Sequence, residues 1–182
     1  LESIPSSPKY LRSSDQRKQK WSELIGPTSK PRLGLVWSGS ENHKNDKNRS
    51  ITLEQILTAI PDRYEVFSLQ KEVRDVDITT LNQNKHIRHF GDMLSDFADT
   101  AALCDLMDII ISVDTSVAHL AGALGKPVNL LLPYVPDWRW LIDREDSPWY
   151  PSLKLYRQSS DQQWKPVFEN VYRALSDTEA LK

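Results

Sequence analysis

One stretch of the sequence decides the fold: Asp108-Ile-Ile-Ile-Ser-Val-Asp114-Thr-Ser-Val-Ala-His119-Leu-Ala-Gly-Ala-Leu-Gly125-Lys-Pro127. The continuous apolar run before Asp114 indicates a strand that is covered on both faces, as strands of a parallel sheet are. A helix follows at once, because Thr115 or Ser116 can cap its start and Gly125 suits the position after its end. The stretch therefore predicts a buried strand, a sharp turn and a short helix.

Strand-like and helix-like segments alternate on both sides of this stretch. Strands are predicted over residues 33–37, 64–69, 86–90, 108–113, 128–132 and 153–156. Helices are predicted over 15–25, 52–60, 95–107, 116–124 and 164–175, whereas 73–84 and 133–151 show no clear periodicity. The alternation predicts an α/β fold, a Rossmann-like doubly wound parallel sheet of about six strands. Right-handed crossovers then place the strand-to-helix loops at one edge, where such folds bind ligands.

Length and composition are those of an ordinary globular protein. The chain has 182 residues, 39% hydrophobic and 26% charged, which is enough for one domain with its own core. We expect residues 1–30 to form an interdomain linker and an N-terminal helix, and residues 31–182 to form the ligand-binding domain. Because Leu1 is not a methionine, we expect the chain to be part of a longer one.

Charge and cysteine content exclude several classes of protein. The formal net charge of −2 gives no electrostatic reason to expect nucleic acid or an anionic membrane as a partner. Cys104 is the one cysteine, which excludes an internal disulfide and suits a reducing cytoplasm. No stretch is long and apolar enough to span a bilayer, and no signal peptide is visible. We therefore expect a cytoplasmic protein without a transmembrane segment.

The turn after Asp114 has the chemistry of an anion site. The first N–H groups of a helix point outward and the helix dipole favours negative charge there. His119 lies on the first turn, able to donate to a phosphate oxygen. In the alternative interpretation, Asp114 and Thr115 only cap a helix and His119 is a satisfied core histidine. The position at the carboxyl end of a central strand favours a ligand site.

A second candidate is the polar loop in Gly34-Leu-Val-Trp37-Ser-Gly39-Ser40-Glu-Asn-His43-Lys-Asn-Asp46-Lys-Asn-Arg49-Ser50. A glycine, small hydroxyls, a histidine and an arginine before the next helix can wrap a phosphate. The loop has neither the glycine spacing of a dinucleotide-binding fingerprint nor a P-loop lysine. A solvated charged loop is an equally good interpretation of its composition.

Two further segments carry weaker signals. Gln70, at the end of the second strand, is able to reach a ribose or a base edge, although ordinary strand-end polarity explains it as well. For Trp138, in the aromatic-rich segment 133–151, sugar or base stacking, docking of another domain and packing over the sheet edge stay open. The histidines show no metal-ligand spacing with carboxylates, so no metal site is predicted.

Together these motifs resemble the C-terminal domain of heptosyltransferase-like proteins, glycosyltransferase family 9. The branch fused to tetratricopeptide repeats is the most similar, and it resembles O-linked N-acetylglucosamine transferases too. The resemblance runs from about Pro31 to the C-terminal helix. The motifs are Gly34-Leu-Val-Trp-Ser-Gly39, Asn45-Asp46-Lys-Asn-Arg49-Ser50, Ser68-Leu-Gln70, Asp99-Thr100-Ala-Ala-Leu, Ser112-Val-Asp114-Thr-Ser-Val-Ala-His119-Leu-Ala-Gly-Ala-Leu-Gly-Lys-Pro127, Pro136-Asp-Trp-Arg-Trp140 and Ser147-Pro-Trp-Tyr-Pro151.

The resemblance implies a GT-B architecture, in which two Rossmann-like domains face each other and the C-terminal one binds a nucleotide-diphosphate sugar. It implies that the diphosphate is held by Asp114, Thr115, Ser116 and His119, that phosphate or sugar is approached by Ser38, Gly39, Ser40 and Arg49, and that the nucleoside is contacted by Gln70 and Thr100. His43 and Trp138, from the two loops, complete the predicted site. The family usually has a glycine at the position of Ser116.

The implied activity is that of an inverting, metal-independent glycosyltransferase of the hexosyl- or heptosyltransferase type, with no cofactor. In this family the general base lies in the N-terminal domain of the same parent chain, so we expect the present chain to be inactive alone. The alternative is a non-catalytic nucleotide-binding or scaffold module of a tetratricopeptide-repeat protein. A nucleotide-sugar epimerase shares the architecture but needs catalytic carboxylate and histidine motifs that we do not find.

Overall fold

The apolar runs pair into one six-stranded sheet in the computed structural model, which describes residue 4 and residues 7–177. The strands are β1 (Arg32–Val36), β2 (Glu65–Ser68), β3 (Ile87–His89), β4 (Ile109–Val113), β5 (Val128–Leu132) and β6 (Leu153–Arg157). Their order is β3-β2-β1-β4-β5-β6, and every neighbouring pair is parallel. Because the order reverses between β1 and β4, the loops leaving these two strands diverge and open a crevice at the carboxyl edge.

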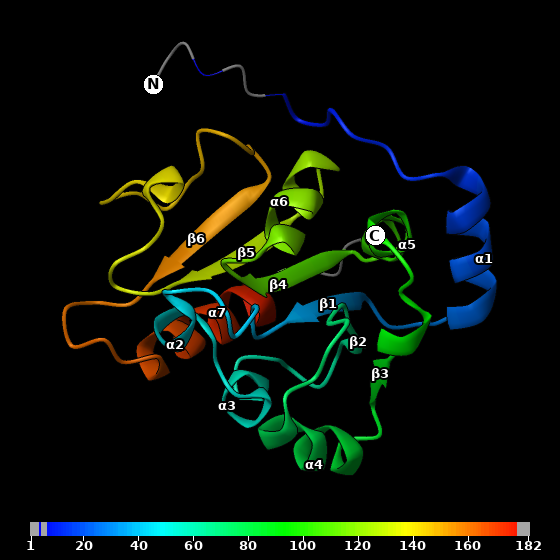
Figure 1. Ribbon diagram of the computed structural model, residues 1–182, viewed down its shortest axis with the longest axis horizontal. Helices are drawn as coiled ribbons and strands as arrows, with labels where there is room; N and C mark the ends of the chain where they lie inside the picture. The colour runs from blue at the N-terminus through cyan, green and yellow to red at the C-terminus, as the bar shows by residue number, and fades with distance from the viewer. Residues whose placement is uncertain (1–3, 5–6, 178–182) are drawn as a thin grey trace.

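Helices cover both faces of the sheet (Figure 1). One face carries α1 (Asp15–Ile25), α5 (Phe97–Asp105) and α6 (Ser116–Ala123), and the other carries α3 (Leu53–Leu57), α4 (Asp75–Gln83) and α7 (Lys165–Asp177). The short helix α2 (Asp46–Arg49) and the 3-10 helices η1 (Gly91–Met93) and η2 (Trp138–Trp140) lie in loops. Within the described residues, no helix is both long enough and apolar enough to cross a membrane.

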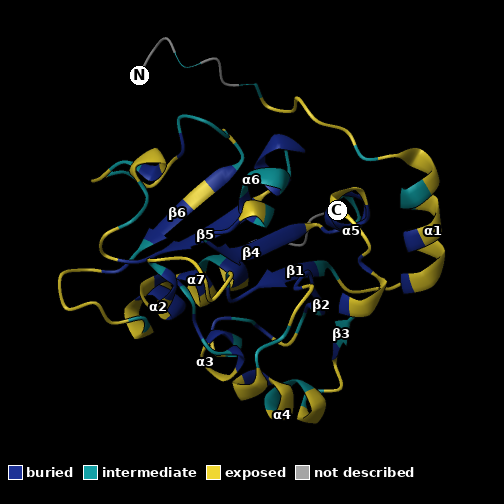
Figure 2. Ribbon diagram, viewed as in Figure 1, coloured by how far each residue is buried: buried dark blue, intermediate teal, exposed yellow. Residues whose placement is uncertain are grey.

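Each strand divides its apolar side chains between two cores, because successive side chains of a strand point to opposite faces. On β4, Ile110 belongs to the core beneath α1, α5 and α6, whereas Ile109 and Ile111 belong to the core beneath α3 and α7. The central strands β4 and β5 are consequently buried along their whole length, whereas the edge strand β6 carries one exposed residue (Figure 2). This double burial is what the continuous apolar runs predicted.

The predicted fold class is confirmed: all six predicted strands form, within one residue of their predicted bounds. The five predicted helices form as well, although α3 ends three residues before position 60. The segment 73–84 holds α4, which the sequence pattern did not reveal. The reason is that α4 reverses the usual distribution of polar and apolar residues: it buries Asp77 and leaves Val76 67% exposed. The Asp77 carboxylate accepts from the Leu53 N–H at 2.8 Å and from the Trp37 indole N–H at 2.8 Å.

The N-terminal residues pack on the sheet domain. The backbone N–H groups of Tyr10 and Leu11 both donate to the carbonyl of Ala123, at the end of α6, at 3.0 Å. Helix α1 then lies against α5 (Figure 1) and buries Trp21 and Ile25 in the core that α5 and α6 share. The helix expected within residues 1–30 is therefore part of the domain's packed core.

Asp99 of α5 ties α1 to the domain. One carboxylate oxygen accepts from the Trp21 indole N–H at 3.2 Å and lies 3.0 Å from an Arg17 guanidinium nitrogen. The other accepts from the hydroxyl and the backbone N–H of Ser95. Burial alone would raise the pKa of Asp99, but the donors from Ser95, Trp21 and Arg17 lower it to about 2.

We predict that Asp99→Asn lowers the free energy of unfolding by about 2 kcal/mol at pH 7, at about 1.4 kcal/mol per pKa unit. A carboxyl group whose folded pKa is depressed stabilises the fold above its unfolded pKa, and this contribution disappears as the pH falls through the folded pKa. The difference between the variant and the wild type should therefore shrink to about 1 kcal/mol at pH 3.

The measurement is urea unfolding followed by tryptophan fluorescence at both pH values. Asp62→Asn, at an exposed carboxylate, is the matched control and should change little. A stability difference for Asp99→Asn that is the same at pH 7 and pH 3 would contradict the assignment.

Candidate functional site at the carboxyl edge of the sheet

The turn between β4 and α6 presents the open N-terminus of a helix. Thr115 stands at the N-cap position, but its hydroxyl lies 3.3 Å from the Ser112 hydroxyl and makes no capping hydrogen bond within the described chain. Of the two predicted cap residues, Thr115 therefore occupies the N-cap position, but its side chain does not cap the helix. Ser116, the first residue of α6, is exposed, and the first turn of α6 carries no acidic residue. The positive end of the helix dipole faces the crevice without a carboxylate of its own turn.

Arg49 joins this turn to the loop that follows β1. Its guanidinium donates to the backbone carbonyl of Asp114 at 2.5 Å, although the two residues are 65 positions apart. The guanidinium also lies against Gly39, where a Cβ atom would come within 2.7 Å of the Arg49 Cζ atom. Arg49 is 9% exposed, and its buried Nε has no hydrogen-bond partner among the described residues. A buried donor without a partner is costly unless something else binds it.

A second arginine holds the β1 loop in place. The Arg74 guanidinium donates to Asp46 Oδ2 at 2.7 Å, to the Gly39 carbonyl at 2.8 Å and to the Ser50 hydroxyl at 3.1 Å. The Ser50 hydroxyl in turn donates to Asp46 Oδ1 at 2.7 Å. Asp46 is buried, with 6% of its surface exposed, and Arg74 is half-buried, so the ion pair is largely shielded from solvent. It fixes the loop on which Gly39 and Arg49 lie.

Two cavities meet at Arg49, Thr115 and Ser116. The first, here called the histidine cavity, has a volume of about 510 Å³ and is lined by His43, Asn45, Arg49, Asp114, Thr115, Ser116, His119, Val135, Pro136, Asp137 and Arg139. The second, here called the apolar cavity, has a volume of about 660 Å³ and is lined by Val36, Ser38, Gly39, Ser40, Arg49, Leu69, Gln70, Lys71, Glu72, Leu94, Ser95, Asp96, Phe97, Thr100, Thr115, Ser116 and Val117. The histidine cavity is therefore polar and charged, and the apolar cavity adds the side chains of Val36, Leu69, Leu94, Phe97 and Val117 to a wall that also carries polar groups.

The structure brings the predicted site residues together, with one exception. All of them except Trp138 line one cavity or both. Trp138 lines neither, although its loop contributes Asp137 and Arg139 to the histidine cavity. Its side chain is 65% exposed, with the Arg139 guanidinium 4.7 Å from its ring centre and Trp149 against it edge to face. Its predicted role in binding stays a prediction.

Gln70 lines the apolar cavity, but its amide is occupied by the protein itself. Its Oε1 accepts from the N–H groups of Trp37 at 3.1 Å and Ser38 at 3.0 Å. Its Nε2 donates to the Ser38 hydroxyl at 3.1 Å and to the Glu72 carbonyl at 2.9 Å. Both donors and both acceptor positions are thus in use. In this geometry the Gln70 amide holds the backbone that follows β1. A hydrogen bond from Gln70 to a nucleoside would require one of these bonds to break.

His119 is a neutral imidazole at the wall of the histidine cavity. Burial lowers its pKa below the ordinary value, and the nearby Asp114 carboxylate opposes this only in part. Asp137 also lines this cavity. Burial alone would raise the pKa of its carboxyl group, but hydrogen bonds from the backbone N–H and the guanidinium of Arg139 lower the pKa below its ordinary value. An anion entering this cavity would favour the protonated form of His119.

Several cavity residues were missed by the sequence analysis. Arg139 and Asp137 flank Trp138 in the quoted motif, but the sequence prediction used only the aromatic residue, as a stacking group, and not the charged pair beside it. Phe97 and Val117 are apolar residues of helical segments, and nothing in their pattern separates them from core residues. Arg74 carries no local signal, because its partners lie 24 to 35 positions away.

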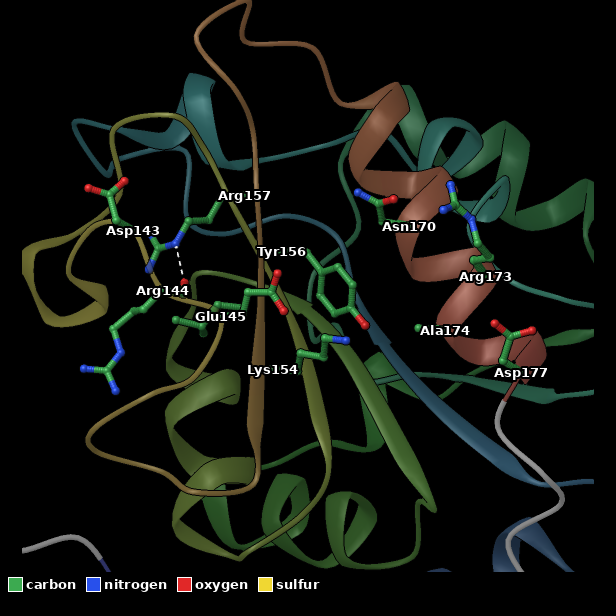
Figure 3. A pocket seen from close by; sticks show the side chains of 11 residues that line it. Asp143, Arg144, Glu145, Lys154, Tyr156, Arg157, Asn170, Arg173, Ala174 and Asp177 are labelled. Atoms are coloured by element: carbon green, nitrogen blue, oxygen red, sulfur yellow. Dashed lines mark hydrogen bonds between the residues drawn. The ribbon is translucent and has the colours of Figure 1, made fainter.

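A further cavity of about 610 Å³ lies between β6 and α7, at the edge of the sheet (Figure 3). Its wall mixes cations with carboxylates: Glu145 and Lys154 lie on one side, and Arg173 and Asp177 lie on α7 on the other. Figure 3 shows the Tyr156 ring between them. This cavity contains none of the predicted site residues and is not formed by the loops that leave β1 and β4. We therefore place the candidate site in the histidine and apolar cavities. In the part of the chain that the structure describes, no group of three His, Cys, Asp or Glu side chains is arranged to hold a metal ion.

The strand order and the crevice define a Rossmann-like α/β domain of the kind found in GT-B glycosyltransferases. Among solved structures, the chain is similar to E. coli ADP-heptose LPS heptosyltransferase II, with a TM-score of 0.61 and 16% sequence identity over 91% of this chain and 52% of that one. It is also similar to WaaG, a glycosyltransferase involved in lipopolysaccharide biosynthesis, with a TM-score of 0.51 and 14% identity over 93% of this chain and 44% of that one. These likenesses show the fold.

Among curated proteins, the chain is similar to Protein FlbA of Caulobacter vibrioides. The two are 28% identical over 191 residues, which cover 97% of this chain and 30% of FlbA. The chain thus spans less than a third of the length of that relative. No protein-family profile matches the chain.

We predict that Gly39→Ala displaces the Arg49 side chain from the Asp114 carbonyl. The added Cβ overlaps the end of a flexible side chain and not the backbone, so the free energy of unfolding should fall by no more than about 1 to 2 kcal/mol. The measurement is the Nε–H signal of Arg49 in a ¹H–¹⁵N NMR spectrum, recorded beside urea unfolding. Ser40→Ala, in the same loop, is the control and should leave the signal in place. An unmoved Arg49 signal in Gly39→Ala would show that the two residues are not in contact.

Proposed function

We propose that the chain is the donor-binding domain of an inverting, metal-independent glycosyltransferase that uses a nucleotide-diphosphate sugar. One observation carries the proposal: the Arg49 guanidinium, held by the Asp114 carbonyl, lines both cavities where they meet, beside the open N-terminus of α6. A guanidinium and free helix N–H groups are the donors that phosphate oxygens bind best. The ADP-heptose heptosyltransferase fold supports the same choice.

The two cavities suit the two ends of such a donor. The diphosphate would lie at their junction, against Arg49, Thr115 and Ser116, with His119 donating from the histidine cavity. The nucleoside would fill the apolar cavity, where Phe97 offers an aromatic ring 58% exposed. Ser38 and Thr100 supply polar groups on its wall.

In the chemical step, this domain would stabilise the departing diphosphate. The leaving group gains negative charge as the sugar bond breaks, and the Arg49 guanidinium and the α6 dipole are held in place before the reaction begins. Such preorganised charges lower the barrier without a metal ion. We propose that the group that activates the acceptor lies in an N-terminal domain of the same parent chain, and that residues 1–30 connect to it.

We predict that the chain binds at least one of ADP, UDP and GDP, and that Arg49→Gln weakens the binding about tenfold or more. The loss follows from one charge-assisted hydrogen bond worth about 1.5 to 3 kcal/mol. His119→Ala should weaken binding as well, because it removes a donor from the wall of the histidine cavity. The measurement is isothermal titration calorimetry with each nucleotide.

Arg173→Gln is the matched control for Arg49→Gln, because Arg173 lines the cavity between β6 and α7. It should leave the affinity unchanged. If no nucleotide binds, or if Arg173→Gln and Arg49→Gln weaken binding equally, the site assignment is wrong.

We predict further that this chain alone transfers no sugar. Under this proposal the chain supplies only the donor site, and the acceptor base lies in another domain. The measurement is product formation from the nucleotide sugar whose nucleotide binds, with water and simple sugars as acceptors. Turnover by the wild-type chain that Arg49→Gln abolishes would overturn the proposal that another domain completes catalysis.

A further inference from the structure

The 3-10 helix η2 places two charged side chains on the wall of the histidine cavity. Its last residue, Trp140, is fully buried, and the Trp140 ring stacks on the His119 imidazole with centres 4.9 Å apart and planes inclined by 24°. This contact holds η2 beside the first turn of α6. Asp137, at the N-cap of η2, and Arg139, within it, both line the cavity to which His119 belongs.

The backbone of Arg139 is fixed, whereas the end of its side chain is accessible. Its N–H donates to Asp137 Oδ1 at 3.0 Å, and its carbonyl accepts from the Trp149 indole N–H at 2.9 Å. The guanidinium lies over the Trp138 ring, 4.7 Å from the ring centre, and the Arg139 side chain is 46% exposed. Stacking leaves the guanidinium N–H groups available, because they point outward in the plane of the group.

The ion pair with Asp137 uses only part of this guanidinium. Nη1 donates to Asp137 Oδ1 at 2.8 Å, and within the described chain no hydrogen bond uses Nε or Nη2 of Arg139. A guanidinium has five donors, and phosphate oxygens accept from two parallel N–H groups at once. The Nε–H and Nη2–H groups form such a pair. Asp137 therefore orients Arg139 and leaves one edge of the guanidinium for a second anion.

Arg139 also decides the charge of the cavity wall. With the histidines neutral, the wall has a formal charge of zero, because Arg49 and Arg139 offset Asp114 and Asp137. Burial lowers the pKa of His119, so this imidazole adds no charge in the free chain at neutral pH. Without Arg139 the wall would be net negative and would oppose the entry of a diphosphate.

The two cavities fix the order in which the parts of a donor lie. The proposed function places the nucleoside in the apolar cavity and the diphosphate at the junction. The phosphate next to the nucleoside then lies on the side of the apolar cavity, and the phosphate bonded to the sugar lies on the side of the histidine cavity. Arg49 lines both cavities, whereas Arg139 lines only the histidine cavity. Arg139 therefore belongs to the end of the diphosphate that carries the sugar.

We propose that Arg139 is a second diphosphate-binding residue and that it binds the β-phosphate, the phosphate bonded to the sugar. This inference rests on the proposed function. As the bond between the anomeric carbon and the β-phosphate oxygen breaks, its electron pair stays on that oxygen, and the Arg139 guanidinium stabilises the charge. The acceptor hydroxyl oxygen forms the new bond to carbon, and its proton goes to the base proposed to lie in another domain.

The first test compares nucleoside diphosphates with monophosphates in calorimetry, using ADP and AMP, UDP and UMP, and GDP and GMP. Arg139→Gln should weaken the binding of the diphosphate about three- to tenfold, because it removes a charge-assisted hydrogen bond at a partly exposed position. It should leave the affinity for the monophosphate unchanged. Arg49→Gln, at the junction, should weaken the binding of both.

Arg144→Gln is the matched control. Arg144 donates to Asp146 at 2.8 and 2.6 Å, so it too pairs with a carboxylate two residues away, but it lines the cavity between β6 and α7. The control removes the same charge from the same kind of ion pair outside the site, and every affinity should stay as in the wild type. An equal loss of diphosphate binding in Arg144→Gln and Arg139→Gln would overturn the inference.

The second test predicts an effect of opposite sign. Asp137→Asn removes a negative charge from the cavity wall and keeps an oxygen that accepts from the Arg139 N–H, since Asn is as good an N-cap residue as Asp. It should tighten the binding of the diphosphate about two- to fivefold. Damage to η2 would weaken binding in both variants, so the opposite signs separate a charge effect from a structural one. Asp146→Asn is the control and should change nothing.

If no diphosphate binds the wild type, the proposed function fails and this inference fails with it. Three outcomes overturn the inference alone while Arg49→Gln still weakens binding: no effect of Arg139→Gln on the diphosphate, an equal effect on the monophosphate, or weaker diphosphate binding in Asp137→Asn. Where a monophosphate binds too weakly to measure, the signs of the effects of Arg139→Gln and Asp137→Asn on the diphosphate decide.

Discussion

The hydrogen bond between the Arg49 guanidinium and the Asp114 carbonyl connects the loops that follow β1 and β4, where the strand order reverses. Strands β1 and β4 are neighbours, but their loops leave toward opposite sides, so no backbone hydrogen bond can join them there. Arg49 spans the gap, and Gly39 leaves the space that its side chain needs. The buried Nε of Arg49 faces the Asp46 carboxylate at 3.8 Å. The rest of the guanidinium belongs to the wall of both cavities, so the side chain that braces the two loops also places a positive charge at the crevice.

A comparison of side-chain capping at the helix N-termini also supports a ligand site at the start of α6. Helices α1, α3 and α5 are closed by side chains, since Ser14, Thr52 and Asp96 accept from their first N–H groups. In α6 the residue at the same position, Thr115, points its hydroxyl toward Ser112. A residue type able to cap the helix is thus present and does not cap it. The N–H groups that it leaves are those nearest to Arg49, which concentrates donors on one side of the crevice.

Local pattern was enough to predict the sheet but not everything that positions the site. The strands are continuous apolar runs, and their burial on both faces explains why each was found within one residue. Helix α4 was not predicted because its buried residue is Asp77, whose carboxylate accepts hydrogen bonds from the loop after β1 and from the start of α3. The motif from Asp114 to His119 is contiguous and could be read directly. Arg74 holds the β1 loop through Ser50 and Tyr150 contacts His119, each from 24 or more positions away, and such contacts exist only after folding.

The N-terminal segment and the site are joined through one short helix. Tyr10 and Leu11 donate to the carbonyl of Ala123 at the C-terminal end of α6, while the N-terminal end of α6 faces the crevice. Gly125 follows with a φ of +71°, and a Cβ atom there would meet the backbone of the segment before Tyr10. The N-terminal segment is therefore packed against the C-terminal end of the same helix whose N-terminal end lies at the junction of the two cavities.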